Sequence, residues 1–581
     1  MAERRKPISF DTTLRNPERI PQFLSLLSFY ENEIMTDDVA LELEAKIIIQ
    51  KIYAPSESTL GTYFHTGNNE ETSDKHSKKV NDYYHEWLES EVGEFDLSKM
   101  KYLLKNTITK HKEAGWNYGW ESRLATQFNF LNELGLCFVK KNKVIKISEN
   151  GKLMIKEYKD GHPKEDNINT NYELSSFLIA FSKYQTNNPF RKNTIKVNFF
   201  SLILNVISYL KINYNRPGIS IQDIPFIITW PNNDFKELAE YIYKFRQKHG
   251  YQNVSNELIY NYAMNLLDES STEKLKEATS EFIESKKNVY KLRKILIETP
   301  DEVIRKLRLT MLISLRGAGR FIDLNNIEND KIEHIKDNYS ENREFQNENE
   351  YYDYMGAIDD DLIFEDMQES QDLLDIKESV IQEWSKNLEW NTIKKEMLSV
   401  AHNSATDNPI LKYIGGPTRL EFLSAIAIKK ALPNLKVIAN YKADDNGIPF
   451  GHASGSSSNS VGSDIDVYEN SVHATLEPTL SKSRNFQIDH ELPSIRSHIL
   501  ESAKIDRKDG TYREWFSIFI APRIAKEVGN QVAVYKSIFK VDVFPWEIED
   551  FILFSQGVNS IKDYKLIREY AQIEVLEEDI L

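Results

Sequence analysis

The chain has 581 residues, several times the usual domain size of roughly 100 to 200 residues, so two to four domains are expected. Its composition, 40% hydrophobic and 28% charged, excludes an intrinsically disordered chain. The single cysteine, Cys137, excludes internal disulfides and zinc fingers. The first residues are polar and basic with no apolar run behind them, and the longest apolar stretch, 197–210, is too short and too polar for a membrane span. We therefore expect a cytoplasmic protein without a signal peptide.

Most of the net charge of −16 comes from one acidic run. Between Glu341 and Asp375 the sequence has 13 acidic residues and one basic residue, so the remainder of the chain has a net charge of −4. A nearly neutral remainder is compatible with basic faces on individual domains, so the overall charge does not exclude nucleic acid as a partner. We interpret the run as a solvated linker. The alternative is that it covers a cationic groove as an electrostatic decoy for DNA.

The first section, residues 1–166, contains a pattern typical of a winged helix. Apolar residues at helical spacing predict a helix over 122–136 that ends at Gly135. Two short β-rich runs follow within 137–147, and Ser148 is positioned to begin another helix. Helix, hairpin and helix in this order indicate a DNA-binding module. Its candidate DNA contacts are Arg123, Gln127, Lys140, Lys141 and Lys143.

The second section, residues 167–340, is predicted to be mostly helical. Near its end, 303–322 is predicted to be one basic helix that breaks at Gly317 and Gly319, followed by a strand-like tail, as in a second winged helix. The alternative is that its long basic side chains only solvate the outer face of an amphipathic helix. The candidate DNA contacts here are Arg305, Arg308, Arg316 and Arg320.

The third section, 341–400, is expected to be an acidic and helical linker, and the fourth, 401–581, an α/β domain. The pattern in the fourth section predicts a helix over 417–432, strands over 463–469, 472–478 and 515–521, and a mobile Ser-rich loop at 454–460. The expected fold is therefore multidomain α+β, with a helical N-terminal region and a C-terminal α/β domain.

Two carboxylates in the fourth section indicate a metal site. Asp464 begins one predicted strand and Glu477 ends the next, and a tight turn at 469–470 would bring them side by side at the edge of the sheet. Paired carboxylates suit Mg²⁺, which can supply hydroxide for attack on a phosphodiester. This is the chemistry of the PD-(D/E)xK nucleases.

The match to the PD-(D/E)xK motif is imperfect. Ser463 takes the place of the motif proline, and Thr479 takes the place of the motif lysine. Lys482 or Glu491 could instead orient or deprotonate water, and Glu421 lies on a predicted helix where such folds often have an acid. The alternative for all of these carboxylates is ordinary surface acid on an acidic protein.

Several segments in order resemble the type IIS restriction and nicking endonucleases of the AlwI, PleI, MlyI and BstNBI group, and are most like AlwI. The segments are ISFDTTLRNPERIPQFL, which holds the further DNA-binding candidates Arg15 and Arg19, then SRLATQFNFLNELGLCFVKKNKVIKISENGKLM, YQTNNPFRKNTIKVNFFSLILNVI, GISIQDIPFIIT, GHASGSSSNSVGSDIDVYENSVHATLEPTLSKSRNF, LPSIR and FSIFIAPRI.

The resemblance implies roles for the residues of the fourth section. Asp464 and Glu477 match the group's metal-binding carboxylates, and Glu421 its helix-borne glutamate. Glu491 matches its third acid, and Lys482 a lysine of its Glu-x-x-x-x-Lys stretch. The long Ser-rich loop before Asp464 departs from the shorter loop of the nicking members.

The implied function is Mg²⁺-dependent cutting of duplex DNA a few base pairs to one side of a short asymmetric site, with GGATC as the expected target. Such an enzyme belongs to the cytoplasm of a bacterium or archaeon, where it acts with a protective methyltransferase against foreign DNA. Because one such site hydrolyses one strand, a transient homodimer through the cleavage domain is expected. The alternatives are a strand-specific nicking enzyme, the large subunit of a heterodimeric type IIS enzyme, a non-enzymatic winged-helix regulator, and a structural helical protein.

Overall fold

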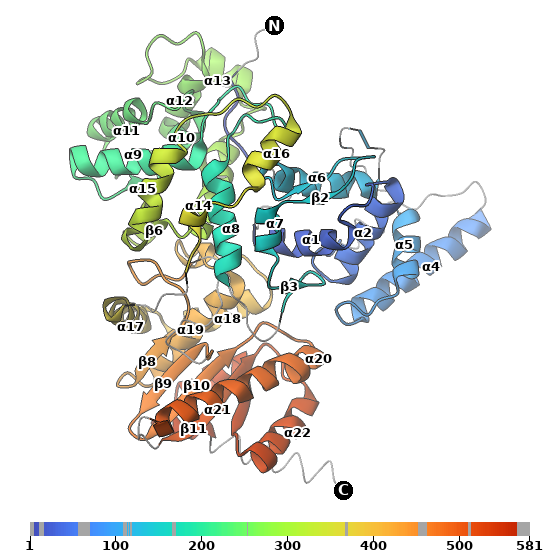
Figure 1. Ribbon diagram of the computed structural model, residues 1–581. Coiled ribbons are helices and arrows are strands. Elements are labelled where there is room, and N and C mark those ends of the chain that lie inside the picture. The colour runs from blue at the N-terminus through green and yellow to red at the C-terminus, as the bar shows by residue number, and fades with distance from the viewer. Residues whose placement is uncertain are drawn as a thin grey trace. The chain divides into compact units, whose positions relative to one another are not determined.

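The computed structural model shows a mixed helical and sheet protein (Figure 1). The residues that it describes are 5–10, 17–55, 70–107, 113, 115–116, 119–164, 170–252, 254–365, 370–450, 462–508 and 513–565. No helix within these ranges is long and apolar enough to cross a membrane. The chain forms two compact units, each made of several segments. Unit 1 comprises Met1–Lys164, Tyr172–Leu312 and Glu328–Phe364, and unit 2 comprises Glu165–Asn171, Ile313–Ile327 and Glu365–Leu581.

Unit 1 is mainly helical. Its N-terminal half contains α1 (Ile20–Leu27), α2 (Asp37–Ile49), α4 (Glu70–Glu89), α5 (Leu97–Lys105), α6 (Trp120–Glu133), β1 (Cys137–Phe138), β2 (Lys146–Ile147), α7 (Glu149–Met154), β3 (Tyr158–Lys159) and β4 (His162–Pro163). Its second half contains α8 (Thr170–Lys183), α9 (Phe199–Tyr214), β5 (Ile219–Ser220), α10 (Ile224–Thr229), α11 (Phe235–His249), α12 (Asn256–Leu267), α13 (Ser280–Lys286), α14 (Thr299–Leu309), α15 (Asn329–Asn338) and α16 (Glu348–Gly356).

The predicted order of helix, hairpin and helix is present in α6, β1, β2 and α7. Helix α6 stops before Gly135, whose φ of +66° favours glycine. A Cβ at Gly135 would also lie 2.1 Å from the Met355 side chain, so the position requires glycine twice over. The Ser148 hydroxyl accepts a hydrogen bond from the Gly151 N–H and begins α7, as predicted.

The prediction of one basic helix over 303–322 is wrong. Helix α14 ends at Leu309, and the chain then forms an antiparallel hairpin of β6 (Ile313–Arg316) and β7 (Phe321–Leu324). Gly317, Ala318 and Gly319 all have positive φ and form the turn. The glycines therefore turn a hairpin instead of ending a helix.

The acidic run is also not a solvated linker. Its first part packs within unit 1, where α16 buries Tyr351 and the Tyr351 hydroxyl donates to the Glu133 carbonyl. Its second part continues into α17 (Gln371–Asn387) of unit 2, which packs against α19 (Gly416–Ala431) through Trp384 and Phe422. The two compact units thus divide the chain differently from the four sections expected from the sequence.

Unit 2 is built on a five-stranded mixed sheet with the strand order β12-β11-β10-β9-β8. Its strands are β8 (Lys436–Ala439), β9 (Ile465–Glu469), β10 (Val472–Pro478), β11 (Glu514–Ala521) and β12 (Val543–Glu547). Its helices are α17, α18 (Trp390–Ala401), α19, α20 (Arg484–Phe486), α21 (Leu492–Lys508), α22 (Lys526–Val534) and α23 (Ile548–Ser555).

The sheet changes direction at β10. Strands β8, β9 and β10 are antiparallel neighbours, whereas β11 and β12 run parallel to β10. A parallel pair needs a long crossover, and α21 supplies it between β10 and β11 (Figure 1). An apolar cluster including Ile495, Phe519 and Val532 holds α21 and α22 to the sheet. The expected helix at 417–432 and the expected strands at 463–469, 472–478 and 515–521 are present within one or two residues, and the expected loop at 454–460 lies outside the described residues.

Candidate metal centre

Asp464 and Glu477 stand opposite each other where β9 begins and β10 ends. The last ladder pair of these strands is Ile465 with Leu476, so the same register places Asp464 directly across from Glu477. Side chains opposite each other in an antiparallel pair have Cβ atoms about 4.5–5.5 Å apart. The turn that sets this register contains Asn470, with a φ of +51°. The hairpin expected from the sequence is therefore the element that brings the two acids together.

Two further carboxylates join this pair. Burial, followed by the charges of Glu421, Glu477 and Glu491, raises the pKa of Asp464 well above its usual value. Burial and then the charge of Glu477 raise the pKa of Glu421 to about 7, against a smaller opposing effect of Lys377. Four neighbouring acids, of which Glu421 and Glu477 are buried, form an arrangement that a divalent cation would stabilise.

Glu491 belongs to the helical segment that follows β10. It ends the π-turn Gln487–Glu491, which leads directly into α21. Burial raises the pKa of Glu491 to about 7, while a hydrogen bond from Thr479 lowers it in part. The same Thr479 takes the place of the motif lysine in the sequence. In the structure Thr479 therefore donates a hydrogen bond that orients Glu491.

His498 also contacts the cluster, and sequence reasoning missed it. Its Nδ1 lies 3.4 Å from Oε1 of Glu477, and its Nε2 lies 3.2 Å from the Ser494 hydroxyl. Burial opposes a charge on this ring, but the neighbouring Glu477 carboxylate outweighs burial and raises the pKa of His498. A signal was present, because Glu491 and His498 are seven residues apart and so share one face of a helix.

Two other residues near the motif have different surroundings. Lys482 is exposed in the segment between β10 and α20, and no ion pair joins it to a carboxylate in the described part of the chain. Gln487 is buried, where its amide donates to the Ser481 and Arg523 carbonyls and accepts from the Ala525 N–H. Gln487 is thus a structural residue whose hydrogen bonds fix the start of the helical turn that ends at Glu491.

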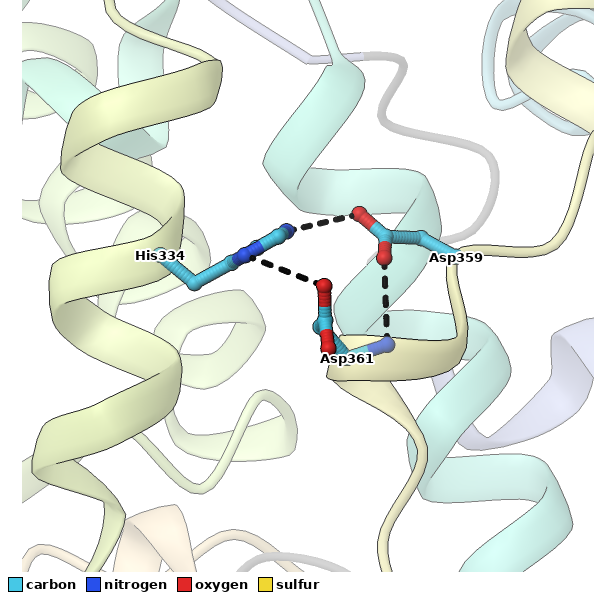
Figure 2. Close-up of side chains that lie close together, drawn as sticks. All are labelled: His334, Asp359 and Asp361. Carbon is cyan, nitrogen blue, oxygen red and sulfur yellow. Dashed lines mark hydrogen bonds and ion pairs between the residues drawn. The ribbon is translucent and has the colours of Figure 1, made fainter.

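A second group of acids lies in unit 1, around His334 of α15 (Figure 2). The Nε2 of His334 lies 2.9 Å from Oδ2 of Asp359, and its Nδ1 lies 3.5 Å from Oδ2 of Asp361. The Tyr339 hydroxyl also donates to Oδ2 of Asp359. Burial raises the pKa of Asp359, but these hydrogen bonds outweigh it and lower the pKa overall. Because both ring nitrogens already face carboxylates, the geometry fits a hydrogen-bonded clasp better than a metal site.

A scan of family models identifies the chain through two matches to the AlwI restriction endonuclease, over residues 132–413 and 402–554. The chain belongs to the AlwI restriction endonuclease family. It is therefore a site-specific DNA endonuclease of the type IIS class, and divalent metal dependence in general follows from the family.

Searches against other proteins add little to the family match. No curated protein matches. Among solved structures, the chain is similar to the small subunit of the heterodimeric restriction endonuclease R.BspD6I, with 20% identity over 31% of this chain and 87% of that chain and a TM-score of 0.23. It is also similar to restriction endonuclease FokI, with 11% identity over 90% of this chain and 96% of that chain and a TM-score of 0.22. FokI bound to DNA gives 11% identity over 96% of both chains and a TM-score of 0.21. These TM-scores are too low to establish a shared fold.

The DNA-binding candidates of this AlwI-family enzyme differ in exposure. In the hairpin of unit 1, Lys143 is exposed, whereas Lys140 is paired with Glu348 and Lys141 with Asp37. Partly exposed positions are Arg19, Arg123 and Arg305. Arg320 is exposed in the β6–β7 turn of unit 2. Arg15 lies outside the described residues.

Three other candidates are buried or half-buried. Gln127 is 2% exposed and Arg308 is 0% exposed, so neither reaches a phosphate or a base. Arg316 is half-buried within unit 2, where its Nη2 lies 2.8 Å from Oδ2 of Asp445. Burial speaks against Gln127 and Arg308 as DNA contacts, because the sequence pattern did not indicate which helix faces would be buried. Arg316 stays a prediction.

Proposed function

We propose that this AlwI-family endonuclease is a Mg²⁺-dependent type IIS enzyme. In this proposal unit 1 recognises a short asymmetric site, with GGATC as the expected sequence, and unit 2 cuts a few base pairs to one side. The observation that carries the proposal is the group of four carboxylates where β9 begins and β10 ends, at the register position of Asp464 and Glu477.

The donor set fits a hard divalent cation. Asp464 and Glu477 would hold the ion, with Glu421 as a further carboxylate from α19. Oxygen ligands of this kind suit Mg²⁺, and the absence of Cys and the peripheral position of His498 make a soft metal a poorer match. The raised pKa values of Asp464 and Glu421 support the same conclusion, because acids that repel one another need a compensating positive charge.

The chain's own groups would bind and orient the reactants. A bound Mg²⁺ would polarise the scissile phosphate and lower the pKa of its water. Glu491, fixed by its hydrogen bond from Thr479, would orient the attacking water. Lys482, exposed on the neighbouring segment, would contact a phosphate oxygen. His498 holds Glu477 from the side of α21 and so limits the rotamers of that ligand.

Recognition is proposed to involve the α6–β1–β2–α7 module, with Lys143 and the partly exposed Arg19 and Arg123 as contacts. Because one nuclease site cuts one strand, double-strand cleavage would require transient pairing of two copies through unit 2. A strand-specific nicking enzyme, which would lack this pairing, is the second candidate, and so is the large subunit of a heterodimeric enzyme.

The test is cleavage of a supercoiled plasmid that contains GGATC sites, in Mg²⁺, Ca²⁺ or chelator, followed by sequencing of the ends. We expect linear product in Mg²⁺ alone, with ends at a fixed offset from GGATC, whereas open circles alone would indicate nicking. Glu477→Ala should abolish cutting and still retain the duplex in Ca²⁺. Glu469→Gln, at the far end of β9, is the matched control and should cut normally. Cutting by Glu477→Ala at the wild-type rate would refute the site.

A further inference from the structure

We propose that Asp466 is a positioning residue that fixes the backbone on both sides of the metal ligand Asp464. The inference rests on the proposed function, in which Asp464 holds the catalytic cation. Asp464 directly precedes β9 and Asp466 is the second residue of that strand, so the alternation of the strand, continued by one residue, puts both side chains on the same face of the sheet. Both acids of the Asp-x-Asp pattern therefore lie near the site. They differ in their hydrogen-bond partners, and this difference gives them different roles.

Both oxygens of Asp466 are already occupied by hydrogen bonds from protein donors. Its Oδ1 accepts from the Ser463 hydroxyl at 2.9 Å and from Nε2 of His473 at 2.7 Å. Its Oδ2 accepts from the Asn440 side-chain amide at 2.8 Å. The side chain is 9% exposed, so these donors replace water. A carboxylate with this set of donors is held in one orientation and is poorly placed to become a metal ligand.

Asn440 extends the network to the peptide groups that flank Asp464. Its backbone N–H donates to the Asp464 carbonyl at 2.9 Å. Its side-chain amide donates to the Ser463 carbonyl at 2.8 Å and to Asp466. The peptide groups on both sides of the metal ligand are thus hydrogen-bonded to one residue, Asn440. Because Asn440 follows β8, these bonds also join the edge strand of the sheet to the site.

His473 connects the network to the strand that bears Glu477. It pairs with Tyr468 across β9–β10 and with Trp515 across β10–β11. Its ring lies between their rings, with centroid distances of 4.1 Å and 3.8 Å. Its Nδ1 has no hydrogen-bond partner in the described structure, so the bond to Asp466 is the polar tether of the ring. Asp466 therefore joins β8, β9 and β10 at the end of the sheet where the two ligands stand.

This geometry gives Asp466 a measurable effect on metal affinity. Outer partners that orient a ligand typically change metal affinity or activity by about 10- to 100-fold when they are replaced. In Asp466→Asn, the new NH2 group would face the Asn440 NH2 group. Two donors would then meet, so the Asn440 side chain would have to turn, which weakens its hydrogen bond to the Ser463 carbonyl. We expect the Mg²⁺ concentration for half-maximal plasmid cutting to rise about tenfold or more. The maximal rate at saturating Mg²⁺ should stay within about threefold of wild type, because no reacting group is removed.

Glu469→Gln is the matched control for this experiment. Glu469 lies on the same strand, and its Oε2 accepts hydrogen bonds from the Ser560 hydroxyl and the Ile561 N–H. Its replacement also removes a hydrogen-bonded charge from β9, but at the end remote from Asp464. We expect an unchanged Mg²⁺ dependence in this variant. An equal shift in both variants would overturn the proposal, because a general weakening of the sheet would then explain the effect.

The inference and the proposed function fail in different ways. If wild type does not cut in Mg²⁺, or if Glu477→Ala cuts, the proposed function fails. If wild type cuts and Asp466→Asn has the wild-type Mg²⁺ dependence, only the positioning role fails. Should Asp466→Asn not fold, Ser463→Ala removes a single hydroxyl from the network. We expect a shift of about threefold in the same direction for that variant, and no shift there would overturn the proposal.

Discussion

The burial of Glu44 in α2 predicts how the free energy of unfolding of unit 1 depends on pH. Glu44 is 0% exposed, so its carboxyl group is removed from water. Burial raises the pKa of Glu44 to about 8, although the nearby Arg123 lowers it in part. A glutamate in an unfolded chain titrates near 4.5. Folding therefore protonates this group between about pH 4.5 and 8.

The sign and size of the effect follow from proton linkage. The folded pKa lies above the unfolded pKa, so the contribution of Glu44 to stability is greatest below pH 4.5 and falls as the pH rises toward 8. Each pKa unit corresponds to about 1.4 kcal/mol, so the loss at pH 8 is about 3–5 kcal/mol. Glu44→Gln removes the ionisable group. The variant should exceed wild type in free energy of unfolding by less than about 1 kcal/mol at pH 5 and by about 3–5 kcal/mol at pH 8.

The assay is urea unfolding read by hydrogen–deuterium exchange of peptides from α2 and α6, because these peptides report on unit 1 alone. Glu42→Gln is the control from the same helix. A hydrogen bond from Lys101 lowers the pKa of Glu42. Its loss should cost about 1 kcal/mol or less at pH 8, because the pair is partly exposed. A difference between Glu44→Gln and wild type that does not change with pH would refute the reasoning.

Two further predictions concern other parts of the chain. Arg316→Ala leaves Asp445 without its ion pair and should lower the free energy of unfolding of unit 2 by about 2–3 kcal/mol, as measured by urea unfolding with exchange of unit 2 peptides. An unchanged stability would mean that the hairpin is not held by this pair. Lys143→Ala should weaken retention of every duplex in Ca²⁺ alike and reduce the slope of log affinity against log salt by about 0.9. A loss confined to one DNA sequence would instead assign Lys143 to a base.

Local signals predicted the part of the site that one hairpin determines. The alternation of apolar and polar residues in β9 and β10, together with the turn at Asn470, sets the register that pairs Asp464 with Glu477. The helical period around Glu421 likewise predicted α19 within one residue of its observed ends. These elements depend on neighbours in the sequence, so the sequence alone predicted them.

Contacts between distant segments could not be predicted in this way. Lys306 is 0% exposed because its ammonium lies 4.8 Å from the centroid of the Phe10 ring, a partner almost 300 residues away. The alternative interpretation, in which the basic side chains of this helix only solvate its outer face, therefore fails for Lys306. Asn440 and His473 likewise meet Asp466 only after three strands have paired. Spacing in one chain does not show which polar groups such pairing will bury.

The most direct measurement of the central claim is anomalous diffraction from crystals of the protein with a duplex, soaked in Mn²⁺. Asp464 and Glu477 should both lie within about 2.0–2.6 Å of one anomalous peak, the range for carboxylate oxygens on hard divalent cations. A peak beside His334, Asp359 and Asp361 alone, or two carboxylates at β9 and β10 that share no ion, would contradict the assignment of the cleavage site.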